Sequence, residues 1–408
     1  MTDHQSQPPP EPRRLSRRAL LYRAGGAGVV LASSPLIGRL EKSFKFSGDA
    51  LAATRSATTL NILTWQGYQD PKWLAEFKAK TGITVNQESV GAPAEMFAKV
   101  RANPGQYDVV FCTAGWFANY VNDDLLMPID ESRIPNIKLI SNVFPWRHAT
   151  TVNGKSYGVL YNWGDVPLGW LSKMVPGSYN VSKYLNKQGV PWDWNILWDP
   201  QFKGLVSMFD SPTDVYPMIG LAAGLKNPYH LSPNGLKLVK QKLLALRPQI
   251  KRLTSGFNDQ TNQFVSKEAI IGYLNNALVA VDVNKAGVPF AANHVMKQGT
   301  PAWSDNASIT THGGAKKLDA VYKFINYELS IPWQARFVAA SGNDGTLSYA
   351  QAVSPQAKAA GLRAKQLGVT LIPQTRNKAF FPSLVFYQST NVLQQELNIW
   401  NEFKLGIH

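Results

Sequence analysis

Histidine, cysteine and serine motifs would be the first sign of catalysis or metal binding in this chain of 408 residues. The six histidines show no H-x-x-x-H or similar ligand spacing, and no G-x-S-x-G or phosphate-loop motif follows residue 52. The single cysteine, Cys112, excludes a disulfide framework and a cysteine-based metal site, and we interpret it as a small buried side chain. The sequence therefore predicts no metal, no cofactor and no enzyme. An exported enzyme remains a second hypothesis, because the three residues of a Ser/His/Asp triad come together in the fold and need not be close in the sequence.

Aromatic side chains are the more informative group. The chain has 12 Trp, 15 Tyr and 18 Phe, which suits ligand clefts as well as hydrophobic cores. Apolar residues make up 44% and charged residues 17%, so the chain can bury a sizeable core and is not disordered in bulk. These values favour a folded protein that binds a small molecule.

Alternating strands and helices position the first aromatic residues. Strands are expected over residues 60–65, 83–85 and 107–111. Helices are expected between and after them, over 71–80, 94–102 and 117–121. This β-α-β-α-β-α order predicts a parallel open sheet, which binds ligands beyond the carboxyl ends of its strands. Those ends are Trp65-Gln66 and Cys112-Thr113.

The remainder of the chain continues in the same α/β style. Asn153-Gly154 predicts a tight hairpin, and residues 157–170 look like a strand. Further strands or helices are expected over 205–209, 215–224, 234–246, 270–273, 278–281, 316–340 and 391–404. One sheet cannot accommodate so many elements, so we infer two α/β lobes.

Residues 1–52 have the pattern of an export signal. Arg17-Arg18 precede an apolar run over 24–37, and Ala50-Leu51-Ala52 fits a cleavage site. The arginine pair is typical of the twin-arginine route, which exports folded proteins, so we expect a periplasmic or other extracytoplasmic location. The alternatives are a basic arm for nucleic acid and an anchor helix. The run is short for about 30 Å of hydrocarbon, which argues against the anchor.

The positive charge is scattered. The chain has a net charge of +15, and residues 1–52 hold eight of the 42 basic and four of the 27 acidic residues, so +11 would remain without them. The densest basic stretch, 237–252, alternates Lys and Arg with Leu at helical intervals, which predicts a solvated helix face. We therefore expect no nucleic-acid partner.

Several motifs, taken in order, resemble a known family. They are Leu60-Asn-Ile-Leu-Thr-Trp65-Gln-Gly-Tyr68, Phe77-x₄-Gly82-Ile-x-Val85, Tyr107-Asp-Val-Val110, Tyr161-x-Trp163-Gly164 and Leu197-Trp198-Asp-Pro200-x-Phe202-Lys203-Gly204. Over about residues 58–408 the chain resembles the exported solute-binding proteins of ABC importers, in the branch typified by spermidine- and putrescine-binding proteins.

The resemblance implies a two-lobed periplasmic-binding-protein fold. A ligand cleft would lie between the lobes and close on binding as hinge strands bend. The N-lobe would comprise 58–168 plus 304–350, and the C-lobe 169–303 plus 351–408. The implied protein is a monomer whose partners are a small ligand and a membrane permease.

The resemblance also implies a binding site. In polyamine-binding members, ammonium groups meet carboxylates and methylene chains lie on aromatic rings, which combines charge-assisted hydrogen bonds with cation–π contacts. The residues at matching positions are Trp65, Gln66, Tyr68, Cys112, Thr113, Asp214, Trp303, Asp305 and Gln388.

Other matching positions depart from the family pattern. Gly67 and Ser211 stand where acids are usual, Leu274 where a Trp is usual, and Asn343 where a Tyr is usual. Asp214 and Asp305 remain as cation partners, which would serve a diamine such as putrescine well and a triamine poorly. An amino-acid-derived, phosphonate-like or sugar ligand is the alternative.

Overall fold

The computed structural model describes residues 58–142, 144–363 and 379–406. By their contacts, the described residues all belong to one compact unit. The predicted export signal, residues 1–52, lies outside the described residues. Within the described part of the chain, no helix has the length and apolar character needed to cross a bilayer.

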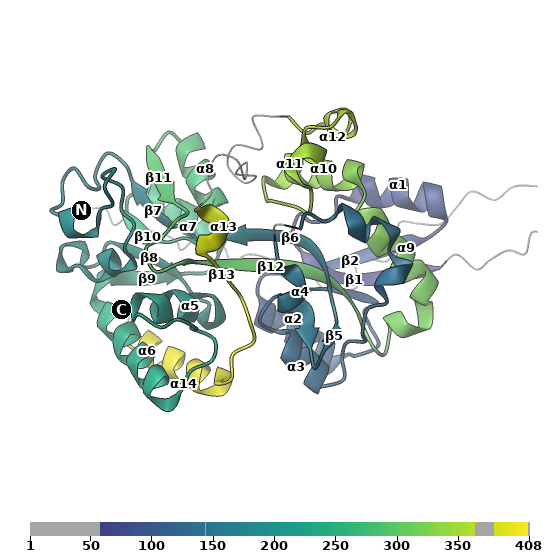
Figure 1. The fold of residues 1–408 in the computed structure, drawn as a ribbon, viewed down its shortest axis with the longest axis horizontal. Coiled ribbons are helices and arrows are strands. Elements are labelled where there is room, and N and C mark those ends of the chain that lie inside the picture. The colour runs from purple at the N-terminus through teal and green to yellow at the C-terminus, as the bar shows by residue number, and fades with distance from the viewer. Residues whose placement is uncertain (1–57, 143, 364–378, 407–408) are drawn as a thin grey trace, which may run out of the picture. The chain divides into compact units, whose positions relative to one another are not determined.

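The first sheet begins with the predicted β-α-β-α-β-α order, which is confirmed (Figure 1). Its three parallel strands are β1 (Thr59–Trp65), β2 (Thr84–Val90) and β3 (Val109–Thr113), with β1 between the other two. The helices that follow them are α1 (Pro71–Thr81), α2 (Pro93–Ala102) and α3 (Phe117–Asn122). Local chemistry sets the ends of α1: Asp70 caps the amide of Lys72, and Gly82 takes the left-handed φ of 74° at the carboxyl end.

Three later strands complete this sheet from distant parts of the chain. They are β6 (Val159–Asp165), β12 (Thr300–Ile309) and β13 (Leu384–Phe386). β12 lies antiparallel to both β3 and β6 and parallel to β13, so a strand from late in the chain runs alongside the carboxyl end of β3. This pairing places Asp305 directly opposite Thr113.

The second sheet has the strand order β11-β7-β10-β8-β9. Its strands are β7 (Leu168–Leu171), β8 (Val206–Phe209), β9 (Ile250–Thr254), β10 (Ile271–Tyr273) and β11 (Phe290–Asn293). Its helices are α5 (Pro212–Ala222), α6 (Pro233–Leu246), α7 (Phe257–Val265) and α8 (Leu278–Lys285). The chain passes from β6 in the first sheet to β7 in the second through Val166 and Pro167 alone.

The remaining elements are short strands and helices. The hairpin predicted at Asn153-Gly154 is confirmed as β4 (Thr151–Val152) and β5 (Lys155–Ser156). The other α-helices are α4 (Trp146–Thr150), α9 (Leu318–Glu328), α10 (Ile331–Ser341), α11 (Tyr349–Ala352), α12 (Pro355–Ala359), α13 (Phe380–Ser383) and α14 (Leu393–Lys404). Short 3-10 helices cover Glu131–Arg133, Pro135–Leu139, Ser182–Tyr184, Trp194–Trp198, Pro200–Phe202, Arg247–Gln249 and Gly314–Lys317.

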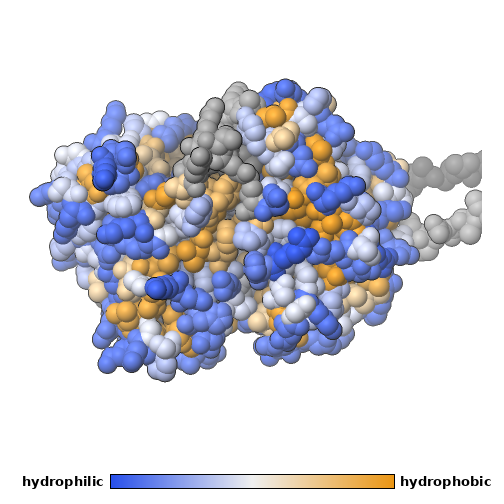
Figure 2. All heavy atoms as spheres, viewed as in Figure 1, coloured by the Kyte–Doolittle hydropathy of each residue, from blue (hydrophilic) through white to orange (hydrophobic). Residues whose placement is uncertain are grey.

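Each sheet has its own hydrophobic core. The first core extends along the chain to Leu384, beyond residue 350, where the N-lobe was expected to end. The second core includes Trp303, which lies on a strand of the first sheet. The next residue along the chain in this core is Tyr387. Hydrophilic residues cover most of the face drawn in Figure 2, with hydrophobic side chains between them.

Candidate functional site

The loop after β1 presents Tyr68 to the neighbouring strands. Its hydroxyl donates a hydrogen bond to Oδ2 of Asp305, and its backbone carbonyl accepts one from the Tyr161 hydroxyl at 2.9 Å. The rings of Tyr68 and Tyr161 are stacked with centroids 5.3 Å apart. Both ends of Tyr68 are therefore fixed, and its hydroxyl is held at Asp305.

Asp305 lies in the middle of β12 and is 5% exposed. The Thr113 hydroxyl, at the end of β3, donates to Oδ1 of Asp305 at 2.5 Å. Burial raises the pKa of the Asp305 carboxyl to about 7. The hydrogen bonds from Thr113 and Tyr68 lower this pKa, and the nearby charge of Asp214 raises it. Near neutral pH this carboxyl can be protonated or ionised, and an approaching cation would favour the ionised form.

Asn162 is a third polar group at this position. It comes from β6, is fully buried, and donates from Nδ2 to the Tyr68 hydroxyl at 2.8 Å. Its side-chain oxygen, Oδ1, has no hydrogen-bond partner among the described residues. A buried acceptor without a donor is costly, so this oxygen is suited to a ligand N–H or O–H group.

Asp214 lies in the first turn of α5, beside the second sheet. Its carboxyl accepts a hydrogen bond from the Ser211 hydroxyl, and its backbone carbonyl accepts from the hydroxyls of Tyr273 and Tyr387 at 2.9 and 3.2 Å. Burial raises the pKa of this carboxyl to about 6, while Ser211 and Tyr387 lower it. Asp305 on β12 and Asp214 on α5 are thus close enough for the charge of Asp214 to act on Asp305.

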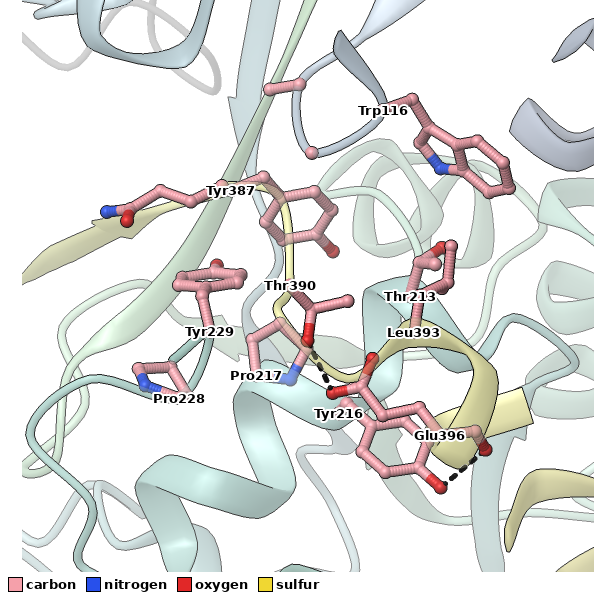
Figure 3. A pocket seen from close by; sticks show the side chains of 13 residues that line it. Trp116, Thr213, Tyr216, Pro217, Pro228, Tyr229, Tyr387, Thr390, Leu393 and Glu396 are labelled. Atoms are coloured by element: carbon pink, nitrogen blue, oxygen red, sulfur yellow. Dashed lines mark hydrogen bonds between the residues drawn. The ribbon is translucent and has the colours of Figure 1, made fainter. Parts of the chain in front are cut away.

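A small pocket lies next to Asp214. Its lining comes from the loop after β3, from α5, from the loop before α6, from the segment that joins β13 to α14, and from the first turn of α14 (Figure 3). Trp116, Tyr229 and Tyr387 supply aromatic surface, and Glu396 supplies a carboxyl group. Asp214 itself is not on the lining, although its neighbour Thr213 is.

The structure brings some of the predicted residues together and not others. Tyr68, Thr113 and Asp305 are joined by hydrogen bonds, and Asp214 is near them.

Cys112 is fully buried, with its thiol against Tyr120 and Ser308, and the lack of solvent raises its pKa to about 12. It lies one residue from Thr113 on β3, and side chains alternate across a sheet, so its thiol and the Thr113 hydroxyl take opposite faces.

The other predicted residues make contacts of their own. The Trp65 indole donates to the Phe111 carbonyl at 2.9 Å, and the Trp303 ring packs so closely on Gly164 that a Cβ there would meet it at 2.8 Å. Gln66 is exposed at the end of β1. Gln388 is exposed and lines the small pocket, with its backbone carbonyl against Gly115.

Sequence reasoning missed four polar residues around the carboxyl groups: Asn162, Tyr229, Tyr273 and Tyr387. Asn162 lies inside the Tyr161-x-Trp163 motif, and Tyr387 directly precedes Gln388, so their positions were signalled but their roles were not. No cluster of three potential metal ligands occurs among residues 58–142, 144–363 and 379–406. The arrangement is one of buried carboxyls, hydroxyls and rings, which suits an organic cation better than a metal ion.

Comparison with known proteins decides the family. Residues 72–365 match the family model described as bacterial extracellular solute-binding protein. The chain belongs to this family. The match confirms the resemblance drawn from the motifs, and members of the family bind solutes outside the cytoplasm.

Individual relatives agree with this membership. The solute-binding chain is 28% identical over 290 residues to the spermidine/putrescine-binding periplasmic protein 1 of Haemophilus influenzae, a match that covers 69% of this chain and 74% of that protein. A spermidine/putrescine transporter substrate-binding protein from Streptococcus pneumoniae has a similar structure, with a TM-score of 0.63 and 21% identity, over 86% of this chain and all of that one.

The same fold also occurs with a different ligand. A periplasmic binding protein from Agrobacterium tumefaciens in complex with glucopine superposes with a TM-score of 0.63 at 14% identity, over 85% of this chain and all of that one. These structures confirm the predicted fold class, and at such identities they show the fold alone.

Proposed function

We propose that this solute-binding protein captures a small organic diamine, such as putrescine, and delivers it unchanged to an ABC importer in the membrane. The cluster of Tyr68, Thr113 and Asp305, with Asp214 nearby, carries the proposal. One ammonium group would meet Asp305 and the free oxygen of Asn162, and the other would meet Asp214. The name of the Haemophilus relative supports the choice of ligand class.

Burial makes the two carboxyl groups sensitive to the arrival of a cation. A carboxyl group that burial keeps partly protonated is a weak ion partner until a cation arrives. A desolvated ammonium group then stabilises the ionised form through charge-assisted hydrogen bonds, which are roughly twice as strong as neutral ones. The neighbouring hydroxyls of Tyr68 and Thr113 already donate to Asp305, so its oxygens are oriented before the ligand binds.

The two sheets would act as two lobes. The short connection at Val166-Pro167 and the segments after β11 and β13 link the sheets, and bending there would open and close the site. A ligand held by Asp305 on the first sheet and by Asp214 on α5, beside the second sheet, would favour the closed state. The protein would work as a monomer that docks on its permease.

The test is calorimetric titration of the protein with putrescine and with butanediol, which has the same chain length but no amine. Saturable binding of putrescine and none of butanediol is expected. Equal binding of both compounds would show that the amines are not recognised. Binding only of a sugar or phosphonate would show that the ligand is neutral or anionic, which the net charge of +15 permits. Recovery of a chemically altered ligand after incubation would instead indicate an enzyme.

Export through the twin-arginine route is the other part of the proposal. Arg17→Lys together with Arg18→Lys should retain the protein in the cytoplasm, because that route requires the arginine pair. Unchanged appearance of this double variant outside the cytoplasm, measured by fractionation and immunoblotting, would exclude the route.

A further inference from the structure

Glu328 is a buried carboxyl group to which the proposed diamine site assigns no role. It is the last residue of α9 and is 1% exposed. Its Oε1 accepts a hydrogen bond from Nε2 of Gln69 at 2.9 Å, and its Oε2 has no hydrogen-bond partner among the described residues. Burial raises the pKa of this carboxyl well above its usual range, and the hydrogen bond from Gln69 opposes that rise. The folded protein therefore favours the uncharged form of Glu328, which still accepts the hydrogen bond from Gln69.

Gln69 connects Glu328 to the loop after β1. This residue directly follows Tyr68 and is 2% exposed. Its side-chain oxygen accepts a hydrogen bond from the Thr64 hydroxyl at 2.8 Å, and its backbone carbonyl accepts one from Nε2 of Gln87 at 2.9 Å. Its side-chain nitrogen donates to Glu328, so Gln69 is held by groups from β1, β2 and α9 at once.

A second chain of hydrogen bonds reaches Tyr68 from α10. Nε1 of Trp333 donates to the Tyr161 hydroxyl at 3.2 Å, and that hydroxyl donates to the backbone carbonyl of Tyr68 at 2.9 Å. Burial raises the pKa of the Tyr161 hydroxyl and a charge on Glu328 adds to that rise, so Glu328 also lies near Tyr161. Groups from α9 and α10 therefore fix the loop whose Tyr68 hydroxyl meets Asp305.

We propose that Glu328 is a positioning residue for the ligand site, which acts through Gln69 to hold the Tyr68 hydroxyl at Asp305. For its effect on the ligand the inference rests on the proposed function, but the placement of the hydroxyl can be measured without a ligand. Loss of the acceptor on Glu328 would leave a buried N–H group of Gln69 unpaired, and the loop would shift to satisfy it. Burial raises the pKa of Asp305 and the hydrogen bond from Tyr68 lowers it, so a weaker bond would let this pKa rise further.

The experiment compares Glu328→Met with Glu328→Gln. Methionine has a similar length but only a thioether, which accepts hydrogen bonds weakly. Glutamine keeps the oxygen that Gln69 needs and, like the protonated acid, carries no charge. The pKa of Asp305 is measured on the empty protein by NMR titration of its carboxyl carbon, whose signal is identified by its loss in Asp305→Asn. We expect this pKa to rise in Glu328→Met and to keep its wild-type value in Glu328→Gln.

Ligand binding provides the second readout. The Kd for putrescine at neutral pH should increase about two- to tenfold in Glu328→Met, as the loss of one neutral hydrogen bond implies, and should be restored in Glu328→Gln. Asn326→Leu is the matched control, because Asn326 lies on the same helix and its side-chain oxygen accepts from the Asn136 amide at 2.7 Å. This control should lower the free energy of unfolding but change neither the pKa of Asp305 nor the Kd.

Two further variants test the route through Tyr68. In a Tyr68→Phe background, Glu328→Met should have no additional effect on the pKa of Asp305, because the hydroxyl through which Glu328 acts is absent. Gln69→Met breaks the same hydrogen bond from its other end and should raise the pKa of Asp305 as Glu328→Met does. It gives the same readout if Glu328→Met does not fold.

The outcomes separate this inference from the proposed function. A wild-type pKa of Asp305 in both Glu328→Met and Gln69→Met would overturn the positioning role, whatever the ligand is. An equal rise in Glu328→Gln, or a rise that persists without the Tyr68 hydroxyl, would also overturn it. Failure of the wild-type protein to bind putrescine would overturn the proposed function, and the pKa of Asp305 in the empty variants would still decide the role of Glu328.

Discussion

Asp305→Asn should weaken ligand binding and, at the same time, stabilise the empty protein at alkaline pH. The asparagine side chain has the same shape and keeps an oxygen that can accept the Thr113 hydroxyl, so the packing of β12 is preserved. What the substitution removes is a carboxyl charge at a position that is 5% exposed.

The size of the stability effect comes from the pKa of Asp305. Burial raises this pKa to about 7, against about 3.9 in an unfolded chain. The folded state therefore binds the proton more tightly, and the free energy of unfolding falls as pH rises from about 4 to about 7. At about 1.4 kcal/mol per pKa unit, the loss above pH 7 is on the order of 4 kcal/mol. Asparagine does not titrate, so the variant avoids this loss.

The binding effect has the opposite sign. Loss of one charge-assisted hydrogen bond to an ammonium group costs about 1.5–3 kcal/mol, which corresponds to a roughly tenfold to 150-fold increase in Kd. Saturating putrescine stabilises the folded state that binds it. Putrescine should therefore raise the free energy of unfolding of the wild-type protein far more than that of Asp305→Asn. At alkaline pH the stability advantage of the variant should shrink or change sign.

The assay is urea unfolding at about pH 5 and about pH 8, with and without putrescine. Asp319→Asn is the control, because Asp319 is fully exposed and paired with Arg133; it should change neither binding nor the pH dependence. The reasoning would be refuted if Asp305→Asn were less stable than the wild-type protein at the higher pH without ligand. An unchanged Kd for putrescine in this variant would show that Asp305 does not hold the ligand.

Three other predictions concern the same site. Asp214→Asn should raise the Kd for putrescine about tenfold or more by calorimetry; wild-type affinity would place the second ammonium group elsewhere. Tyr68→Phe removes a hydroxyl that lowers the pKa of Asp305, so that pKa should rise further and putrescine affinity at neutral pH should fall; an unchanged pH profile would contradict this. In the wild-type protein, the Kd for putrescine should decrease as pH rises from about 5 to about 8. The reason is that carboxyl groups with pKa values of about 6 and about 7 must ionise to hold the ammonium groups. A lower affinity at the higher pH would exclude ionised carboxyl groups as the partners of the ligand.

Local patterns were enough to predict the start of the fold. The first half of β1 alternates polar and apolar side chains, and α1 has Asp70 at one end and Gly82 at the other, so both elements are encoded within a few residues. Such signals do not depend on the rest of the chain. The same holds for the hairpin at Asn153-Gly154.

β12 shows why other elements escaped prediction. All ten of its residues are buried, polar and apolar alike, so the strand has no alternating pattern to read. Its polar residues are buried because partners from β3, β6 and the loop after β1 satisfy them, and those partners are remote in sequence. α7 was missed for a similar reason, since Gln260 and Gln263 lie on its buried side.

The candidate site was predicted in part. Asp305 and Tyr68 were chosen through family motifs, and the structure joins them by a hydrogen bond. Cys112 and Thr113 were both predicted at the site. The two side chains take opposite faces of β3, and a strand buried on both sides gives no sequence signal for which face each one takes. The pocket that Glu396 lines was not predicted, because segments far apart in the chain form it.

Calorimetric titration of the wild-type protein with putrescine at neutral pH, repeated with Asp305→Asn, shows whether a buried carboxyl group holds a diamine. We expect saturable binding by the wild-type protein and a loss of affinity of about tenfold or more in the variant. No binding of any amine by the wild-type protein, together with binding of a neutral or anionic solute, would contradict it.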